Sequence, residues 1–122
     1  MIKIVFCLRR RADLSREEFQ DYWLTCHAPL VRSHADVLGI RKYVQVHSID
    51  DAISTAVAGP RQSPQPFDGV AELWFDSLDA LIAAGGSEAG RAASKELLED
   101  ERRFIDLERS PLMLANEHVV ID

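Results

Sequence analysis

Apolar positions recur along this chain with two periods, and the two periods predict alternating strands and helices. Runs rich in β-branched and aromatic residues predict strands, at residues 2–8, 40–49, 69–75 and 112–121. Apolar residues spaced by three and four predict helices, from about residue 16 to 38 with a kink near 27–28, from 78 to 84, and from 89 to 103. Residues 50–68 combine prolines with small and polar side chains, so a long loop is expected there.

Capping and stop signals fix the ends of the first helical region. Ser15 followed by Glu18 is a capping box, in which each side chain bonds the backbone N–H of the other residue. Pro29 removes a helical N–H, which accounts for the expected kink, and Gly39 is a typical C-terminal stop. The side of this region expected to be buried is mainly aromatic, and consists of Phe19, Tyr22, Trp23 and Cys26.

The element order β-α-β-β-α-β is that of the ferredoxin-like fold, an α+β arrangement with a four-stranded antiparallel sheet. A sheet covered on one face should alternate apolar and polar residues, but these strands are apolar on both faces. In the third strand, Leu73 and Phe75 share one face and Trp74 lies on the other. A chain of this length supplies helices for one face only. The sequence therefore predicts a homodimer, in which two sheets close into a dimeric α/β barrel.

Composition limits the class of protein further. A chain of 122 residues, 47% of them hydrophobic, suits one domain over residues 1–122. No apolar stretch approaches the ~20 residues that span a bilayer, and the N-terminus lacks the pattern of a signal peptide. The net charge is −6, and residues 62–122 carry five basic against thirteen acidic residues, which disfavours nucleic acid as a partner. Two cysteines outside any CxxC motif favour a reduced, cytoplasmic protein.

His27 is the first candidate for chemistry. It follows Trp23 by four residues and Phe19 by eight, so the three share the inward side of the helix. An imidazole titrates near neutral pH and could act as a general acid or base on a carbonyl compound. The alternative is a core histidine bonded to a carbonyl that Pro29 leaves free.

Glu72 is the second candidate. It lies in mid-strand between apolar residues, on the same side as Trp74, and should face the interior of the predicted barrel. A buried carboxylate needs a partner or a raised pKa, and either state suits acid–base work. The alternative is a structural ion pair with Arg9 or Lys42.

Tyr43, Gln45 and His47 share one face of the second strand. If that face points into the same interior, these side chains could orient a substrate; otherwise it is a solvent-facing edge. Trp74 forms either a wall of the substrate site or simple packing, and Phe19 with Trp23 would line the helical side. The sequence has neither metal-ligand spacing nor a nucleotide-binding glycine motif, so no metal and no cofactor are expected.

One segment carries a resemblance to a known family. Phe19, Tyr22-Trp23 and His27-Ala28-Pro29-Leu30, together with Asp106 and the final Glu117-His118, resemble the EthD family of the dimeric α/β-barrel superfamily. EthD-type proteins were first associated with degradation of ethyl tert-butyl ether, a catabolic setting. Relatives in the superfamily are cofactor-free monooxygenases, lactone isomerases, and polyketide cyclases or dehydratases. The resemblance implies a cleft between sheet and helices that holds a small, largely apolar carbonyl compound.

Two classes of function follow from the residues and the resemblance together. The first is a small cofactor-independent enzyme that works by proton transfer (isomerisation, dehydration or cyclisation) on an apolar carbonyl or lactone compound. In it His27 is the general acid or base, Glu72 assists, and Tyr43 with Trp74 holds the substrate. A cofactor-free monooxygenase is the alternative among enzymes. The second class is a non-catalytic carrier or accessory protein for a hydrophobic metabolite.

Overall fold

The computed structural model describes all 122 residues, and its centre is a four-stranded antiparallel sheet. The strands lie in the order β2-β3-β1-β4 and span Ile2–Leu8 (β1), Lys42–His47 (β2), Gly69–Phe75 (β3) and Leu112–Ala115 (β4). The helices span Arg16–Tyr22 (α1), Ala28–Leu38 (α2), Ala52–Ala58 (α3), Leu78–Gly86 (α4) and Glu88–Glu101 (α5). A π-helical turn at Trp23–His27 joins α1 to α2, and 3₁₀ turns cover Gly59–Arg61 and Leu107–Arg109.

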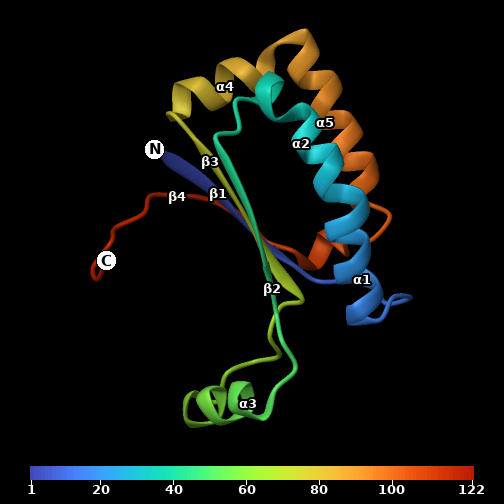
Figure 1. Cartoon of the computed structure of the whole chain (residues 1–122), viewed down its shortest axis with the longest axis vertical. Coiled ribbons are helices and arrows are strands. Elements are labelled where there is room, and N and C mark those ends of the chain that lie inside the picture. Colours follow the sequence, from blue (N-terminus) through green and yellow to red (C-terminus); the bar gives the residue numbers. More distant parts are fainter.

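This strand order, with α1, α2, α4 and α5 in one layer on one face of the sheet (Figure 1), is a ferredoxin-like α+β fold. The fold class predicted from the sequence is confirmed. No helix is both long enough and apolar enough to cross a membrane.

The predicted capping signals act as expected. Ser15 accepts a hydrogen bond from the backbone N–H of Glu18, and the Glu18 carboxylate accepts one from the N–H of Ser15. Gly39 ends α2 with φ of 71°, a left-handed conformation that a residue without a Cβ adopts easily.

The kink expected near Pro29 takes the form of one π-helical turn. The N–H of Ala28 donates to the carbonyl of Trp23, five residues back, where an α-helix would use a residue four back. Pro29 cannot donate to the carbonyl of Thr25, and its ring would collide with that carbonyl in a regular α-helix. The wider turn is a way to relieve this conflict, and it places one extra residue between α1 and α2.

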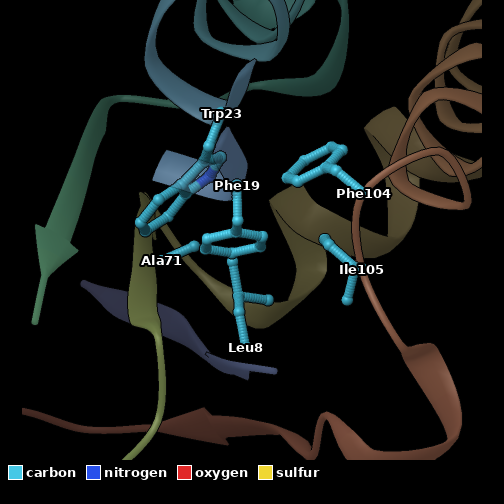
Figure 2. Packing of buried hydrophobic residues seen from close by; sticks show 6 residues of the cluster. All are labelled: Leu8, Phe19, Trp23, Ala71, Phe104 and Ile105. Carbon is cyan, nitrogen blue, oxygen red and sulfur yellow. The ribbon is translucent and has the colours of Figure 1, made fainter. Parts of the chain in front are cut away.

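The core lies between the covered face of the sheet and the helices (Figure 2). Phe19 and Trp23 point from the first helical region toward the strands, and Phe104 packs beside Phe19 with ring centroids 5.5 Å apart. The buried cluster consists of Leu8, Phe19, Trp23, Ala71, Phe104 and Ile105. Even-numbered residues of β1 and odd-numbered residues of β2 and β3 belong to this covered face, as the pairing of Phe6 with Ala71 shows.

The other face of the sheet, which we call the uncovered face, has no helix layer (Figure 1). It carries the apolar side chains that the sequence places on a second face: Val5, Cys7, Val44, Val46, Val70, Trp74 and Met113. Val46 and Met113 are 45% and 56% exposed. An apolar sheet face of this kind is typical of a surface that meets another protein surface.

Four sequence predictions of local structure were wrong. The loop expected at 50–68 contains α3, because Asp51 caps a proline-free stretch by accepting from the N–H of Ile53. The last strand stops at Ala115 instead of 121, since no strand pairs with the residues that follow. The helix from 78 continues through both glycines to Gly86, and Ser87 caps the next one. Cys26 is exposed, because His27 takes the inward position one turn after Trp23.

Candidate active site

His27 is buried at the end of the π-helical turn and is bonded to an acidic side chain from a different helix. Its Nδ1 lies 2.7 Å from Oδ2 of Asp100, which is itself buried near the end of α5. The predicted alternative, a bond to a carbonyl freed by Pro29, is not what the structure shows. A carboxylate at Nδ1 fixes the imidazole tautomer with the proton on Nδ1, and it leaves Nε2 with its lone pair.

Asp100 is held by three residues. The Tyr22 hydroxyl donates to Oδ1 at 2.5 Å, and an Arg103 guanidinium nitrogen lies 3.6 Å from the same oxygen. The Phe104 ring packs against His27 and Tyr22, with ring centroids 5.0 Å and 5.1 Å away, respectively. The carboxylate is therefore fixed by hydrogen bonds and packing before any ligand arrives, which suits a residue that positions another.

The second ring nitrogen of His27, Nε2, makes no side-chain hydrogen bond. No buried side-chain nitrogen or oxygen in the structure lacks a hydrogen-bond partner. Because the one side-chain hydrogen bond of His27 uses Nδ1, Nε2 keeps its lone pair without a side-chain partner and is not completely enclosed, although His27 as a whole is only 5% exposed. Burial lowers the pKa of His27 below its ordinary value, while the hydrogen bond to Asp100 opposes the shift. The imidazole is thus neutral at pH 7 and able to accept a proton.

Glu101, next to Asp100 in α5, carries a proton more readily than an ordinary carboxyl group. Burial raises the pKa of Glu101 to about 7, and the negative charge of Asp100 adds to the shift. Burial also raises the pKa of Tyr43, and the charge of Glu101 contributes to that shift. Both groups are therefore able to donate a proton or a hydrogen bond near neutral pH.

Tyr43 lies at one end of a chain of polar side chains along β2. The ring of His47 stacks on Trp23 with centroids 4.6 Å apart, and its Nε2 is 2.8 Å from Oε1 of Gln45. The Gln45 amide donates to the Tyr43 hydroxyl oxygen and to the Trp23 carbonyl, each at 2.9 Å. Since the Tyr43 oxygen accepts this bond, its own O–H remains able to donate to a ligand.

The structure divides the predicted site residues between the two faces of the sheet. His27, Tyr43, His47, Phe19 and Trp23 lie on the covered side, and Phe19 and Trp23 are fully buried in its core. Glu72 and Trp74 lie on the uncovered face, because alternate residues of a strand point to opposite sides. The sequence left open whether the face of Tyr43 and His47 shares the interior of Glu72, and the structure shows that it does not.

Glu72 is paired with Lys3, at 3.0 Å, and not with Arg9 or Lys42. Lys3 also pairs with Glu117 at 3.1 Å, and its ammonium group lies 4.8 Å from the centre of the Trp74 ring. The Trp74 indole N–H donates to Glu117 at 3.3 Å. These side chains form one charged cluster on the uncovered face. The sheet itself lies between this cluster and the His27–Asp100 pair.

Sequence reasoning missed Asp100 as a partner of His27, and it missed Tyr22 and Glu101 as members of the same group. A signal was present in α5 and the turn that follows it, where Ala93, Asp100 and Phe104 recur at intervals that place them on one buried side. An acid at such a position needs a partner, and His27 is a buried side chain able to supply one. Periodicity alone does not tell which acid meets which histidine.

The other histidines and acids have local explanations. His34 is 2.9 Å from Glu96 at the surface, and Asp106 pairs with Arg109 within one turn at 3.8 Å. No group of three or more histidine, cysteine or acidic side chains is arranged to hold a metal ion. Two hollows lie near residues 50–68, where one groove of about 430 Å³ runs along α3 and a polar one of about 730 Å³ separates that segment from α1. A third, of about 660 Å³, lies between the turn after β1 and the segment after α5.

The fold is shared with several solved structures. An EthD family protein from Bacillus halodurans C-125 is 20% identical, with a TM-score of 0.63, and the match covers 97% of this chain and 99% of that one. A dimeric protein of unknown function with a ferredoxin-like fold from Bacteroides fragilis is 13% identical, covering 95% of each chain, with a TM-score of 0.58. SnoaB, a cofactor-independent oxygenase from Streptomyces nogalater, is 14% identical, covering 98% of this chain and 95% of SnoaB, with a TM-score of 0.55.

The sequence itself matches a family model. No curated protein matches the chain. The model of the EthD domain, however, matches residues 11–108, which include the capping box, the π-helical turn, His27 and Asp100. Together with the ferredoxin-like topology, this match shows that the chain belongs to the EthD family.

Proposed function

We propose that this protein is a homodimeric enzyme that moves a proton on a small, largely apolar carbonyl or lactone compound without a cofactor. The observation that carries the proposal is the 2.7 Å contact between His27 Nδ1 and Asp100, which leaves Nε2 without a side-chain hydrogen bond. A neutral imidazole oriented by a fixed carboxylate is a suitable general base. Fold alone does not select a reaction, so the proposal depends on this site.

The reaction follows from the groups on the covered side of the sheet. His27 Nε2 removes a proton from the carbon beside the carbonyl group, and the electron pair of the C–H bond moves to form an enolate. The Tyr43 hydroxyl donates a hydrogen bond to the developing oxygen anion. A proton then returns to a different atom from His27 or from Glu101, which completes an isomerisation. A dehydration would instead expel a hydroxyl group that takes this proton and leaves as water.

Apolar side chains on the same side suit the substrate class. Leu73 pairs with Tyr43 across the sheet, and both pack against the core without being fully buried, as does Phe6. A small apolar compound beside Tyr43 would contact these side chains, while its carbonyl oxygen meets the hydroxyl group. Glu72 and Trp74, on the uncovered face, have no part in this mechanism.

The dimer in this proposal rests on the uncovered face. That face is apolar and has no helix layer of its own, and one protein of the same fold is described as dimeric. Face-to-face packing of two sheets would bury it. Light scattering at micromolar concentration should give twice the chain mass, and a monomer would contradict this part of the proposal.

The enzymatic part is tested by following deuterium from solvent into a panel of small ketones and lactones by mass spectrometry. We expect exchange or isomerisation with at least one compound. His27→Ala should reduce the rate by about 10²–10⁴-fold while binding of that compound, measured by calorimetry, is retained. His34→Ala, a surface histidine of the same helical region, is the matched control and should leave the rate unchanged.

Each other outcome identifies a different function. Binding without turnover in the native protein, equally weakened in both variants, would contradict the enzyme and favour a carrier or accessory protein. Oxygen uptake with the same compounds would favour the cofactor-free monooxygenase instead.

A further inference from the structure

Helix α3 lies apart from the rest of the molecule. It extends beyond the end of the sheet, away from the helix layer (Figure 1), and none of its residues is buried. Ile53 and Val57 are 69% and 58% exposed, one turn apart on the same side of the helix. With Ile49 they form the apolar wall of the groove of about 430 Å³.

Both ends of the segment that contains α3 nevertheless contact the rest of the fold. Before the helix, Arg16 pairs with Asp50 at 3.3 Å. After it, the Arg9 guanidinium donates to the carbonyls of Gln65 and Pro66 and lies 4.4 Å from the centre of the Phe67 ring. An apolar helix held in place but left open is typical of a surface that binds another segment.

The C-terminal segment 116–122 has a matching character. Val119, Val120 and Ile121 are all more than 70% exposed. Glu117, bonded to Lys3 and to the Trp74 indole, holds the start of this segment against the uncovered face. Figure 1 shows the segment leaving the sheet on the side away from the helices.

The spacing of the two segments agrees. In an extended chain Val119 and Ile121 point to the same side about 7 Å apart, and Ile53 and Val57 lie about 6 Å apart on one side of α3. Arg61, one turn beyond Val57, forms no ion pair and lines the same groove. Asp122 follows Ile121 directly and offers the opposite charge.

Within one chain the two segments are far apart. The C-terminal segment leaves β4, at one edge of the sheet, from the end marked by Ala115 and Trp74. α3 follows β2, at the other edge, from the opposite end marked by His47 and Gly69. They therefore occupy diagonally opposite corners of the sheet. A two-fold axis along the other diagonal, between two facing sheets, brings each segment onto the partner's α3.

We infer that, in the dimer of the proposed function, residues Val119–Asp122 of each protomer bind the α3 groove of the other. Val119 and Ile121 pack on Ile53 and Val57, and the Asp122 carboxylate pairs with Arg61. The contact occurs twice, as two-fold symmetry requires. It holds the two sheets face to face from outside the barrel.

Disulfide trapping tests the contact directly. Both native cysteines are replaced (Cys7→Ala, Cys26→Ala), and a chain with Val57→Cys is mixed with an affinity-tagged chain carrying Ile121→Cys. Under mild oxidation the two should form a covalent heterodimer. The matched control replaces Val57→Cys by Ile82→Cys, an equally exposed position on α4, and should give no such product.

Charge exchange supplies a second measurement. Arg61→Asp or Asp122→Arg should each weaken the dimer about tenfold in a dilution series, which corresponds to ~1.4 kcal/mol. The double exchange should restore its affinity. If the protein is a dimer but neither forms the heterodimeric disulfide nor responds to these charge changes, residues 119–122 do not bind the partner's α3. The proposed dimer would then still stand. A monomer at every concentration would overturn both.

Discussion

The two faces of the sheet use their side chains in different ways. On the covered face, aromatic residues from the first helical region and from the turn after α5 pack around Phe19, and no fully buried side-chain nitrogen or oxygen lacks a hydrogen-bond partner. On the uncovered face, aliphatic side chains surround one charged cluster in which Lys3 meets two carboxylates. The covered face is buried by helices of the same chain, whereas the uncovered face is an apolar surface with no helix layer over it.

In the proposed function, this difference separates the groups that carry the chemistry from the surface that forms the dimer. The His27–Asp100 pair depends on contacts that one chain makes by itself, so we expect it to be formed before any partner binds. The Lys3 cluster gains strength only when solvent is removed, because an exposed ion pair contributes about 0–1 kcal/mol. Substitutions on the two faces should therefore report on different events.

The largest effect is expected for Phe104→Ala. Its ring packs on Phe19, Tyr22 and His27, so truncation leaves a cavity in the core and loosens the site. The free energy of unfolding should fall by about 3–5 kcal/mol, measured by chemical denaturation at a fixed protein concentration. Met113→Ala, on the uncovered face, should change it by less. Equal losses would contradict the division between the two faces.

Lys3→Met should show whether the uncovered face is covered in solution. Glu72 and Glu117 would lose their shared cation. Between two packed sheets this should cost about 2–4 kcal/mol of stability, because an uncompensated charge is left buried. Arg41→Met breaks an exposed pair with Asp76 and serves as control, with an expected loss below about 1 kcal/mol. Losses of the same small size in both variants would show that the face remains in water.

Gly69→Ala tests how closely the helices approach the covered face. A Cβ at Gly69 would overlap the Trp23 ring and touch the backbone of Val46, so the indole has to move. We expect a loss of about 1–3 kcal/mol. In Gly85→Ala the new methyl group meets nothing within 4 Å, and helix propensity should stabilise the protein by up to about 1 kcal/mol. Thermal unfolding should move the two variants in opposite directions.

The smallest effect concerns pH. The folded-state pKa of Glu101, about 7, lies above its ordinary value. The stability that the protonated Glu101 contributes to the fold is therefore present at acid pH and is lost as pH rises through 7. Glu101→Gln should therefore raise stability by about 1–2 kcal/mol at pH 8 and leave it unchanged at pH 4. The exposed Glu99→Gln is the control. His27 acts in the other direction: its lowered pKa removes stability as pH falls below about 6.5.

The sequence predicted the sheet well because its strands carry strong local patterns. Gly69–Phe75 and Ile2–Leu8 agree with prediction at both ends. The capping box at Ser15 and the stop at Gly39 were also found, since each depends on residues close together in the chain. α3 was missed because the prolines that follow it dominate the composition of its neighbourhood.

The candidate site was predicted only in part. His27 could be found because its spacing from Trp23 is a local property. Its pairing with Asp100 joins positions 73 residues apart and depends on how α5 packs against the π-helical turn. Which face Tyr43 shares was also undecided, because strand alternation gives two sets of residues but does not say which set the helices cover.

The single π-helical turn has a consequence for how this site can arise or disappear in evolution. A residue advances by about 100° around an α-helix, so the extra residue in this turn sets the angle of α1 relative to α2. One residue gained or lost between Trp23 and His27 would therefore move the His27 imidazole relative to Asp100, while the strands of the sheet keep their register.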